Sequence, residues 1–263
     1  MTGSYRTYYV NQKTGRDSND GLTMDSPFAS LFQVNRLRLY PGDKVLLARD
    51  SVFTDQFLQM KDSGTREHPI EIGSYSPEEE GEGKNPLIAA GGQGIWYQDY
   101  GTTLDSPAHV YVSSAVLLYD VEHVVIHDIE ISNQAVEILG EDYSAPHKMN
   151  RTGVAVVAKD KGVRSGITLH NLSIHDVNGN VYDKHMNNGG IYMTALKPAD
   201  EKATGVARFK DITVEGCFVY KTSRWGIAVG YTYAHDKFQG AELPEDTFLK
   251  YGHENMVIRD NYV

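Results

Sequence analysis

Four stretches of the chain share one order of apolar, polar and turn-forming residues, with Asp, Asn or Gly at the same place in each. They are Val125-Ile126-His127-Asp128-Ile129-Glu130-Ile131, Thr168-Leu169-His170-Asn171-Leu172-Ser173-Ile174, Thr213-Val214-Glu215-Gly216-Cys217-Phe218-Val219 and Val257-Ile258-Arg259-Asp260-Asn261-Tyr262-Val263. Aligning Ile126, Leu169, Val214 and Ile258 gives steps of 43, 45 and 44 residues. A fixed period of this length is typical of stacked structural repeats.

A second type of strand follows three of these stretches and begins with glycine each time. The three runs are Gly153 to Val157, Gly190 to Thr194 and Gly226 to Gly230, and their glycines suggest tight corners. Each repeat then forms a coil of short parallel strands, which buries its apolar face against the coils on either side. The sequence predicts an all-β protein, a right-handed parallel β-helix forming a single domain over residues 1–263. An antiparallel β-sandwich also has many short strands, but it does not predict the regular period.

The first part of the chain predicts one helix and several further strands. The amphipathic segment Phe28 to Leu39 predicts a short helix that caps the N-terminal end. Four short β-rich runs follow it: Lys44 to Ala48, Phe57 to Met60, Ile70 to Tyr75 and Pro86 to Ala90. The pattern reaches Val263 in mid-coil, so we expect a C-terminally incomplete β-helix that is aggregated or inactive when expressed alone.

Composition limits the partners of the chain. It has 263 residues, with 25 Lys and Arg against 35 Asp and Glu, and a net charge of −10. This balance lacks the basic footprint of a nucleic-acid binder and suits a neutral substrate such as a sugar. The single cysteine, Cys217, lies in a strand-like run and is expected to be a small buried hydrophobe. No apolar run reaches the length of a membrane span, and the sequence leaves the compartment open.

The densest run of polar residues extends from His175 to Gly190 and joins the two types of strand. Glycoside hydrolysis commonly uses two carboxyl groups, and Asp176 and Asp183 are a candidate pair in this run. Their separation in space decides between retention, at about 5 to 5.5 Å, and inversion, at about 6.5 to 9.5 Å. Asp and Asn also serve as turn formers at the corners of stacked coils, and the run alone does not decide between these roles.

Other polar and aromatic residues near these carboxyls are candidates for binding sugar. Arg224 and Trp225 fall one repeat later at the equivalent corner, where a guanidinium and an indole ring suit hydroxyl groups and sugar faces. A structural Trp covered by an Arg would look the same in sequence. The complete set of predicted substrate-binding residues is Tyr182, His185, Asn188, Arg224, Trp225 and Tyr231.

Several long runs resemble one family of carbohydrate-active enzymes. They are Gly94 to Gln98, Met149 to Ala155, Asn180 to Tyr192 and Arg224 to Thr232. On these runs, and more broadly from Tyr8 to Val263, the chain is similar to the β-helical lacto-N-biosidases of glycoside hydrolase family 136.

The resemblance implies a function, a mechanism and a setting. The function is release of lacto-N-biose, Gal-β1,3-GlcNAc, from lacto-N-tetraose with retention. Asp176 matches the acid/base and Asp183 the nucleophile. The resemblance also implies an oligosaccharide substrate, a gut bacterium that uses human milk oligosaccharides, an extracellular or cell-surface location, and a companion helical domain or chaperone subunit. No cofactor or catalytic metal is expected, and a structural Ca²⁺ is left open.

Two other functions fit a parallel β-helix. A polysaccharide lyase would need an acidic Ca²⁺ cluster and a basic residue over a uronic acid, and the acidic balance of the chain argues against a polyanionic substrate. A non-catalytic β-helix would bind glycans with the same polar loops. Substitution of Asp176 and Asp183 separates a binder from a hydrolase, because a binder has no turnover to lose.

Overall fold

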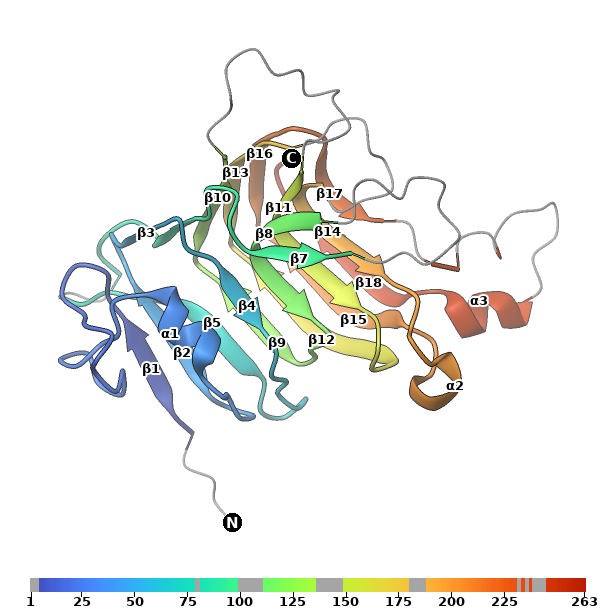
Figure 1. Cartoon of the computed structure of the whole chain (residues 1–263), viewed down its shortest axis with the longest axis horizontal. Coiled ribbons are helices and arrows are strands. Elements are labelled where there is room, and N and C mark those ends of the chain that lie inside the picture. The colour runs from blue at the N-terminus through green and yellow to red at the C-terminus, as the bar shows by residue number, and fades with distance from the viewer. Residues whose placement is uncertain are drawn as a thin grey trace.

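The computed structural model describes residues 5–78, 81–98, 111–135, 149–179, 188–230, 233–234, 237 and 245–263 of the chain. These residues form a stack of short, mostly parallel strands with few helices (Figure 1). Strands that are far apart in sequence lie side by side, whereas successive strands mostly fall in different sheets. The predicted all-β class is confirmed.

The strands form three sheets, called A, B and C below. Sheet A contains, in order, β1 (Thr7–Val10), β2 (Lys44–Ala48), β5 (Ile70–Tyr75), β9 (Val124–His127), β12 (Val163–His170), β15 (Arg208–Glu215) and β18 (Glu254–Arg259). Sheet B contains β3 (Val52–Thr54), β6 (Leu87–Ala89), β10 (Glu130–Asn133), β13 (Ser173–Val177) and β16 (Phe218–Thr222). Sheet C contains β4 (Leu58–Met60), β8 (Tyr111–Tyr119), β11 (Asn150–Ala158), β14 (Gly189–Ala195) and β17 (Trp225–Val229), with β7 (Ile95–Tyr97) antiparallel to β8.

From β9 onward the chain visits the three sheets in a fixed order. It runs through β9, β10 and β11, then β12, β13 and β14, then β15, β16 and β17, and returns to sheet A with β18. One passage through sheets A, B and C is called a coil below. Each strand pairs in parallel with its counterpart in the next coil, so the sheets run along the stack.

The register confirms the sequence alignment residue by residue. Ile126 pairs with Leu169, Leu169 with Val214, and Val214 with Ile258. The shared turn-forming residue follows at the bend out of sheet A, where Asp128, Asn171, Gly216 and Asp260 have φ of 54°, 51°, 62° and 55°. Gly, Asn and Asp tolerate this left-handed conformation better than other residues, which explains why each repeat has one of them there.

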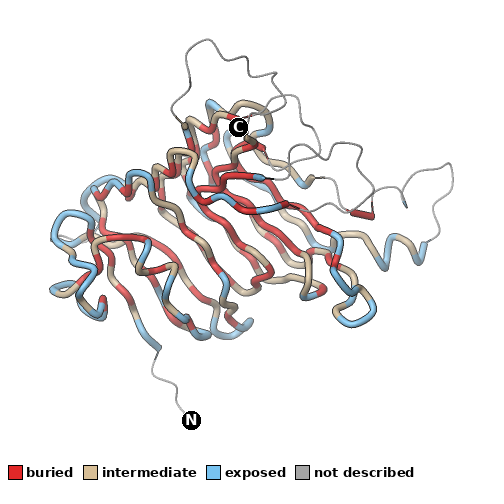
Figure 2. Tube along the Cα trace, viewed as in Figure 1, coloured by how far each residue is buried: buried red, intermediate tan, exposed pale blue. Residues whose placement is uncertain are grey.

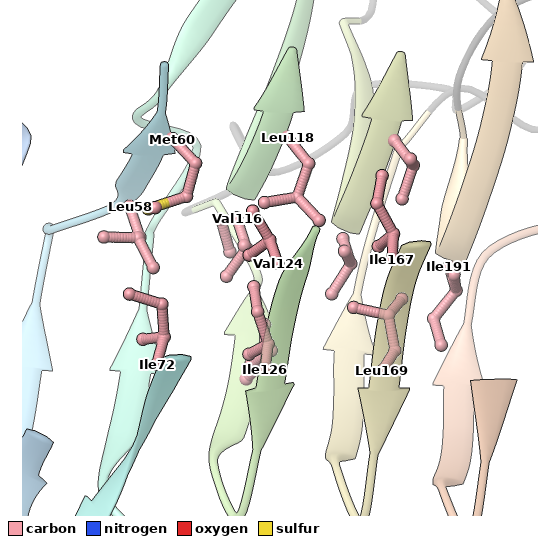
Figure 3. Packing of buried hydrophobic residues seen from close by; sticks show 14 of the residues in the cluster. Leu58, Met60, Ile72, Val116, Leu118, Val124, Ile126, Ile167, Leu169 and Ile191 are labelled. Carbon is pink, nitrogen blue, oxygen red and sulfur yellow. The ribbon is translucent and has the colours of Figure 1, made fainter. Parts of the chain in front are cut away.

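The hydrophobic core lies between the sheets and is built from ladders of inward side chains. Figure 3 shows Ile72, Ile126 and Leu169 of sheet A in one ladder, with Leu58 and Ile191 of sheet C across the core. All five are at most 1% exposed. Burying an aliphatic side chain of this size contributes about 1.5–3 kcal/mol, and Figure 2 shows buried positions recurring along the strands of the stack.

The glycines that begin the second type of strand lie within sheet C, not at its corners. Gly153, Gly190 and Gly226 fall inside β11, β14 and β17. A Cβ on Gly190 would lie 2.6 Å from the carbonyl oxygen of Gly226 and 2.4 Å from the Val219 side chain. The glycines therefore permit close stacking of successive coils, and the prediction of tight corners there was wrong.

The helices differ most from the sequence prediction. The predicted helix over residues 28–39 is only α1 (Leu31–Arg36), because Phe28 bridges to Val10 and Leu37 turns to an extended conformation with ψ of 152°. Two further helices were not predicted, α2 (Glu201–Thr204) and α3 (Glu245–Tyr251). No helix in the described ranges is long and apolar enough to cross a membrane.

Candidate active site

The structure describes four of the predicted site residues. Asp176 lies in β13, Asn188 immediately before β14, and Arg224 and Trp225 at the start of β17. The other four, Tyr182, Asp183, His185 and Tyr231, lie outside the described residues.

Asp176 occupies a bulge near the end of β13. Ser132 of β10 pairs with His175, but the next pair joins Asn133 to Val177, so Asp176 is an extra residue in the ladder. Its φ is 49°, in the left-handed region. One coil later Lys221 takes the same place in β16, with a φ of 51°. The bulge turns the side chain of Asp176 away from the regular alternation of the strand.

The Asp176 carboxyl group contacts His175 and Lys221, and His175 in turn contacts Glu130. The ring of His175 is placed between two carboxylates, with Nδ1 2.6 Å from Asp176 Oδ2 and Nε2 2.7 Å from Glu130 Oε1. Lys221 Nζ lies 3.8 Å from the other oxygen, Oδ1. The Asp176 side chain is 33% exposed and that of His175 13%. Asp176 is thus a surface carboxylate with one oxygen anchored.

The chain on the N-terminal side of residue 180 is firmly held. Asn178 exchanges two hydrogen bonds with the backbone of Ala135, accepting from its N–H and donating to its carbonyl. Arg151 donates to the Asn178 carbonyl over 3.1 Å. A Cβ on Gly179 would lie only 2.9 Å from the backbone nitrogen of Arg151. These contacts fix the backbone directly after Asp176.

The chain that follows residue 187 is fixed by buried polar contacts. Asn188 is 0% exposed, donates to Asn150 Oδ1 over 3.2 Å, and accepts from the hydroxyl of Ser223 over 3.2 Å. Gly189 has a φ of 127°, and a Cβ there would meet the carbonyl oxygen of Trp225 at 2.1 Å. The amide nitrogen and oxygen of Asn188 thus both form hydrogen bonds within the protein, and a role of Asn188 in binding sugar stays a prediction.

Arg224 and Trp225 lie next to this anchor, as the repeat predicts. Trp225 pairs with Gly189 across sheet C. The guanidinium carbon of Arg224 lies 5.1 Å from the centre of the Trp225 ring, within the range of a cation–π contact. Trp225 is 38% exposed, so part of its surface is available to a ligand.

A curated protein and a solved structure that resemble this chain are both named lacto-N-biosidases. No family model matches the sequence. The chain is 58% identical to a GH136 lacto-N-biosidase from Eubacterium ramulus, with a TM-score of 0.91 over 98% of this chain and 41% of that one. The selenomethionine form of that enzyme matches with 59% identity and the same TM-score. The chain belongs to glycoside hydrolase family 136.

A curated relative from a second organism is also named a lacto-N-biosidase. The lacto-N-biosidase of Bifidobacterium longum subsp. longum is 36% identical over 297 residues, covering 100% of this chain. The chain spans 18% of that relative and 41% of the solved enzyme.

Two other aromatic residues, Tyr233 and Trp96, are buried. Tyr233 is 7% exposed and donates its hydroxyl to Glu201 over 3.0 Å. Burial and the neighbouring Glu201 raise the pKa of Tyr233 well above its usual range. Trp96 is 8% exposed, and its indole N–H donates to Ser114 Oγ over 2.8 Å. Both side chains support the fold.

No role was predicted from the sequence for His175 and Lys221, which contact Asp176, or for Glu130, which contacts His175. The available signal was the His-Asp dipeptide, which occurs at residues 127–128 and 175–176 and again at 235–236, outside the described residues. Cys217 is 2% exposed, and burial raises the pKa of its thiol, as expected for an inert cysteine. Among the described residues, no group of three or more His, Cys, Asp or Glu is placed to hold a metal ion.

Proposed function

We propose that the protein containing this chain is a retaining glycoside hydrolase that releases lacto-N-biose from lacto-N-tetraose or related β-linked glycans. The observation that carries the proposal is the 58% identity, over 98% of the chain, to an enzyme described as a lacto-N-biosidase. The anchored, partly exposed carboxyl group of Asp176 supports it, since such a group suits proton transfer at a glycosidic oxygen.

In the proposed reaction, Asp176 is the acid/base and Asp183 the nucleophile. Asp183 attacks the anomeric carbon while Asp176 gives its proton to the departing oxygen, which yields a covalent glycosyl-enzyme and the remaining sugar as an alcohol. Asp176 then takes a proton from water as the water oxygen attacks the same carbon and releases Asp183. Two displacements retain the β configuration, and the two carboxyl groups are expected about 5–5.5 Å apart.

We further propose that aromatic and polar side chains around these carboxyls hold the disaccharide. Trp225, which is partly exposed beside Gly189, is suited to stack on a sugar face. Tyr182, His185, Asn188, Arg224 and Tyr231 are proposed as its partners in binding. The carboxylate mechanism needs no cofactor, and a structural Ca²⁺ stays an open prediction.

The proposed architecture is a right-handed parallel β-helix forming one domain over residues 1–263. The fixed order of sheets A, B and C supports it, because parallel crossover connections are right-handed in almost all proteins. We propose that further coils, together with a helical companion domain or chaperone, complete the active enzyme. We also propose a gut bacterial setting and a location outside the cell or on its surface, where milk oligosaccharides are met.

The test uses the whole natural protein that contains this sequence, incubated with lacto-N-tetraose. Chromatography should show Gal-β1,3-GlcNAc and the remaining disaccharide, and proton NMR at early times should show the β anomer of lacto-N-biose first. Asp183→Ala should lose turnover even of an activated aryl lacto-N-bioside, because the nucleophile is needed whatever the leaving group. Binding without turnover would identify a glycan-binding protein, and an initial α anomer would identify an inverting enzyme.

A further inference from the structure

Glu130, His175 and Asp176 form a continuous hydrogen-bonded row on the outer surface of sheet B. The His175 ring contacts Asp176 Oδ2 at 2.6 Å and Glu130 Oε1 at 2.7 Å, both short distances that are typical of charge-assisted bonds. The ring of Tyr220, one coil later, stacks on His175 with centres 5.0 Å apart and planes at 21°. His175 is thus fixed by two hydrogen bonds and one ring contact.

The partners of His175 determine which atoms carry protons. Ionised carboxylates only accept hydrogen bonds, so when Glu130 and Asp176 are both charged, both ring nitrogens must donate and the ring is an imidazolium. Asp176 Oδ2 is then occupied as an acceptor. In the described part of the chain, the contact of Asp176 Oδ1 is Lys221, whose Nζ at 3.8 Å is beyond hydrogen-bond distance.

We propose that His175 is a positioning residue for the proton transfer by Asp176, and that Glu130 holds His175 in place. This inference rests on the proposed function and deepens it. His175 keeps Oδ2 as a fixed acceptor, which assigns the transferred proton to Oδ1. The same hydrogen bond limits rotation of the carboxyl group, because it holds one of the two carboxyl oxygens in place.

The proton balance of the step is complete without a co-reactant. The proton on Oδ1 moves to the departing glycosidic oxygen as the bond from that oxygen to the anomeric carbon breaks. The resulting Asp176 carboxylate keeps its Oδ2 hydrogen bond to His175 Nδ1, which stabilises the new negative charge. In the second displacement, water returns a proton to Oδ1 as its oxygen bonds to the anomeric carbon.

The experiment compares His175→Asn with His175→Gln in the whole natural protein. The amide nitrogen of Asn reaches roughly the position of Nδ1, next to Asp176, whereas that of Gln reaches roughly the position of Nε2, next to Glu130. Both substitutions remove the ring that stacks on Tyr220, so they are matched for lost packing. His127→Gln is the control, since His127 makes the same kind of contacts with Glu71 and Asp128 at another corner.

The expected result is a loss in kcat that depends on the leaving group. His175→Gln should lower kcat on lacto-N-tetraose by about 10- to 100-fold, part of the 10²–10⁴ that general acid–base catalysis typically supplies. Its loss on an aryl lacto-N-bioside with a good leaving group should be under about 5-fold, with KM little changed. His175→Asn should retain more activity than His175→Gln, and His127→Gln should stay near wild type.

Glu130→Gln provides a second route if the His175 variants do not fold, and thermal melting of each variant identifies that case. Glu130→Gln should show the same dependence on the leaving group with a smaller loss of kcat, and Glu71→Gln should not.

Equal losses of kcat on both substrates, or no advantage of His175→Asn over His175→Gln, would overturn the positioning role. Asp176→Ala and Asp183→Ala are assayed alongside. If they keep turnover, the proposed function fails; if they lose it while His175 and His127 variants behave alike, only this inference fails.

Discussion

The corner at His127–Asp128 and the bulge at His175–Asp176 are built from the same parts. In each, a His is followed by an Asp in the left-handed conformation, with a φ of 54° for Asp128 and 49° for Asp176. In each, Nδ1 contacts the following Asp, at 2.7 and 2.6 Å, and Nε2 contacts a Glu of the preceding coil. The local sequence and the φ of the Asp therefore do not separate them.

The two regions differ at the second oxygen of the Asp. Asp128 Oδ1 accepts a hydrogen bond from the Nδ2 amide of Asn171 in the next coil. The neighbour of Asp176 Oδ1 is Lys221, at an ion-pair distance of 3.8 Å. One carboxyl group has both oxygens committed to holding the stack, whereas the other keeps an oxygen outside such a bond. In our proposal, the neighbour in the next coil decides which of the two Asp residues takes part in catalysis.

The largest expected effect is on turnover. If it is absent, Asp176 and Asp128 do not differ in function as we propose. Asp176→Asn should lower kcat on lacto-N-tetraose by about 10²–10⁴, because the amide cannot deliver a proton. Asp128→Asn should change it less than about 2-fold, as expected for a surface substitution away from the chemistry. Azide should partly rescue Asp176→Ala on an activated aryl glycoside. Similar losses for the two Asn variants would show that both carboxylates are structural.

The second prediction concerns stability, where the Asp128 variant is expected to be affected more than the Asp176 variant. Asp128→Ala removes charge-assisted bonds from His127 and Asn171 and puts Ala in the left-handed region, so it should cost about 1–3 kcal/mol. Asp176→Ala loses one such bond and should cost less. Urea unfolding of both variants measures the difference. Equal costs would mean that the bond from Asn171 adds nothing.

The third prediction concerns the contribution of Asp128 to stability at acidic pH. Burial raises the pKa of Asp128, but hydrogen bonds from His127 and Asn171 lower it more, so the net pKa is below its ordinary value. The folded state therefore holds the charged form better than the unfolded state, whose pKa is about 3.9. The stabilisation is complete above that value and is lost as the pH falls through the lower, folded pKa. The stability gap between wild type and Asp128→Asn should close over this window, and a constant gap would contradict the assignment.

The smallest expected effect concerns His253, which lies outside both His-Asp regions. Burial, with a contribution from Arg208, lowers the pKa of His253 from 6.5 to about 4. Between these values the unfolded chain binds a proton that the folded chain does not, so stability should fall as the pH drops from 6.5 to about 4. His253→Gln should flatten this slope in thermal melts at pH 4.5 and 6.5. An unchanged slope would show that other groups cause it.

Some parts of the fold could be predicted because they repeat. The register of Ile126, Leu169 and Val214 follows from their spacing, since stacked coils need the same type of side chain at the same place. The strands over residues 44–48 and 70–75 were predicted with the bounds that the structure gives. The first helix was overestimated, because apolar spacing does not reveal that Phe28 pairs with Val10 instead of entering the helix.

The site was predicted less completely, for a geometric reason. Asp176 was found as a carboxylate in a polar run, and the contact of Trp225 with Gly189 followed from the repeat. The link from His175 to Glu130 runs diagonally, since His175 is in register with Ser132. A spacing argument finds residues in register and misses such diagonal partners.

The sequence by itself determined the period of the stack, the ladders of apolar residues and the places where the backbone must turn, because each depends on residue type at a fixed interval. The tertiary structure alone decided the environment of each polar side chain. The same dipeptide is structural at His127–Asp128, where Asn171 follows in the next coil, and is offered to substrate in our proposal at His175–Asp176, where Lys221 follows. The physical reason is that hydrogen bonds depend on ångström distances between coils, which the bulge at Asp176 changes and no count along the chain records.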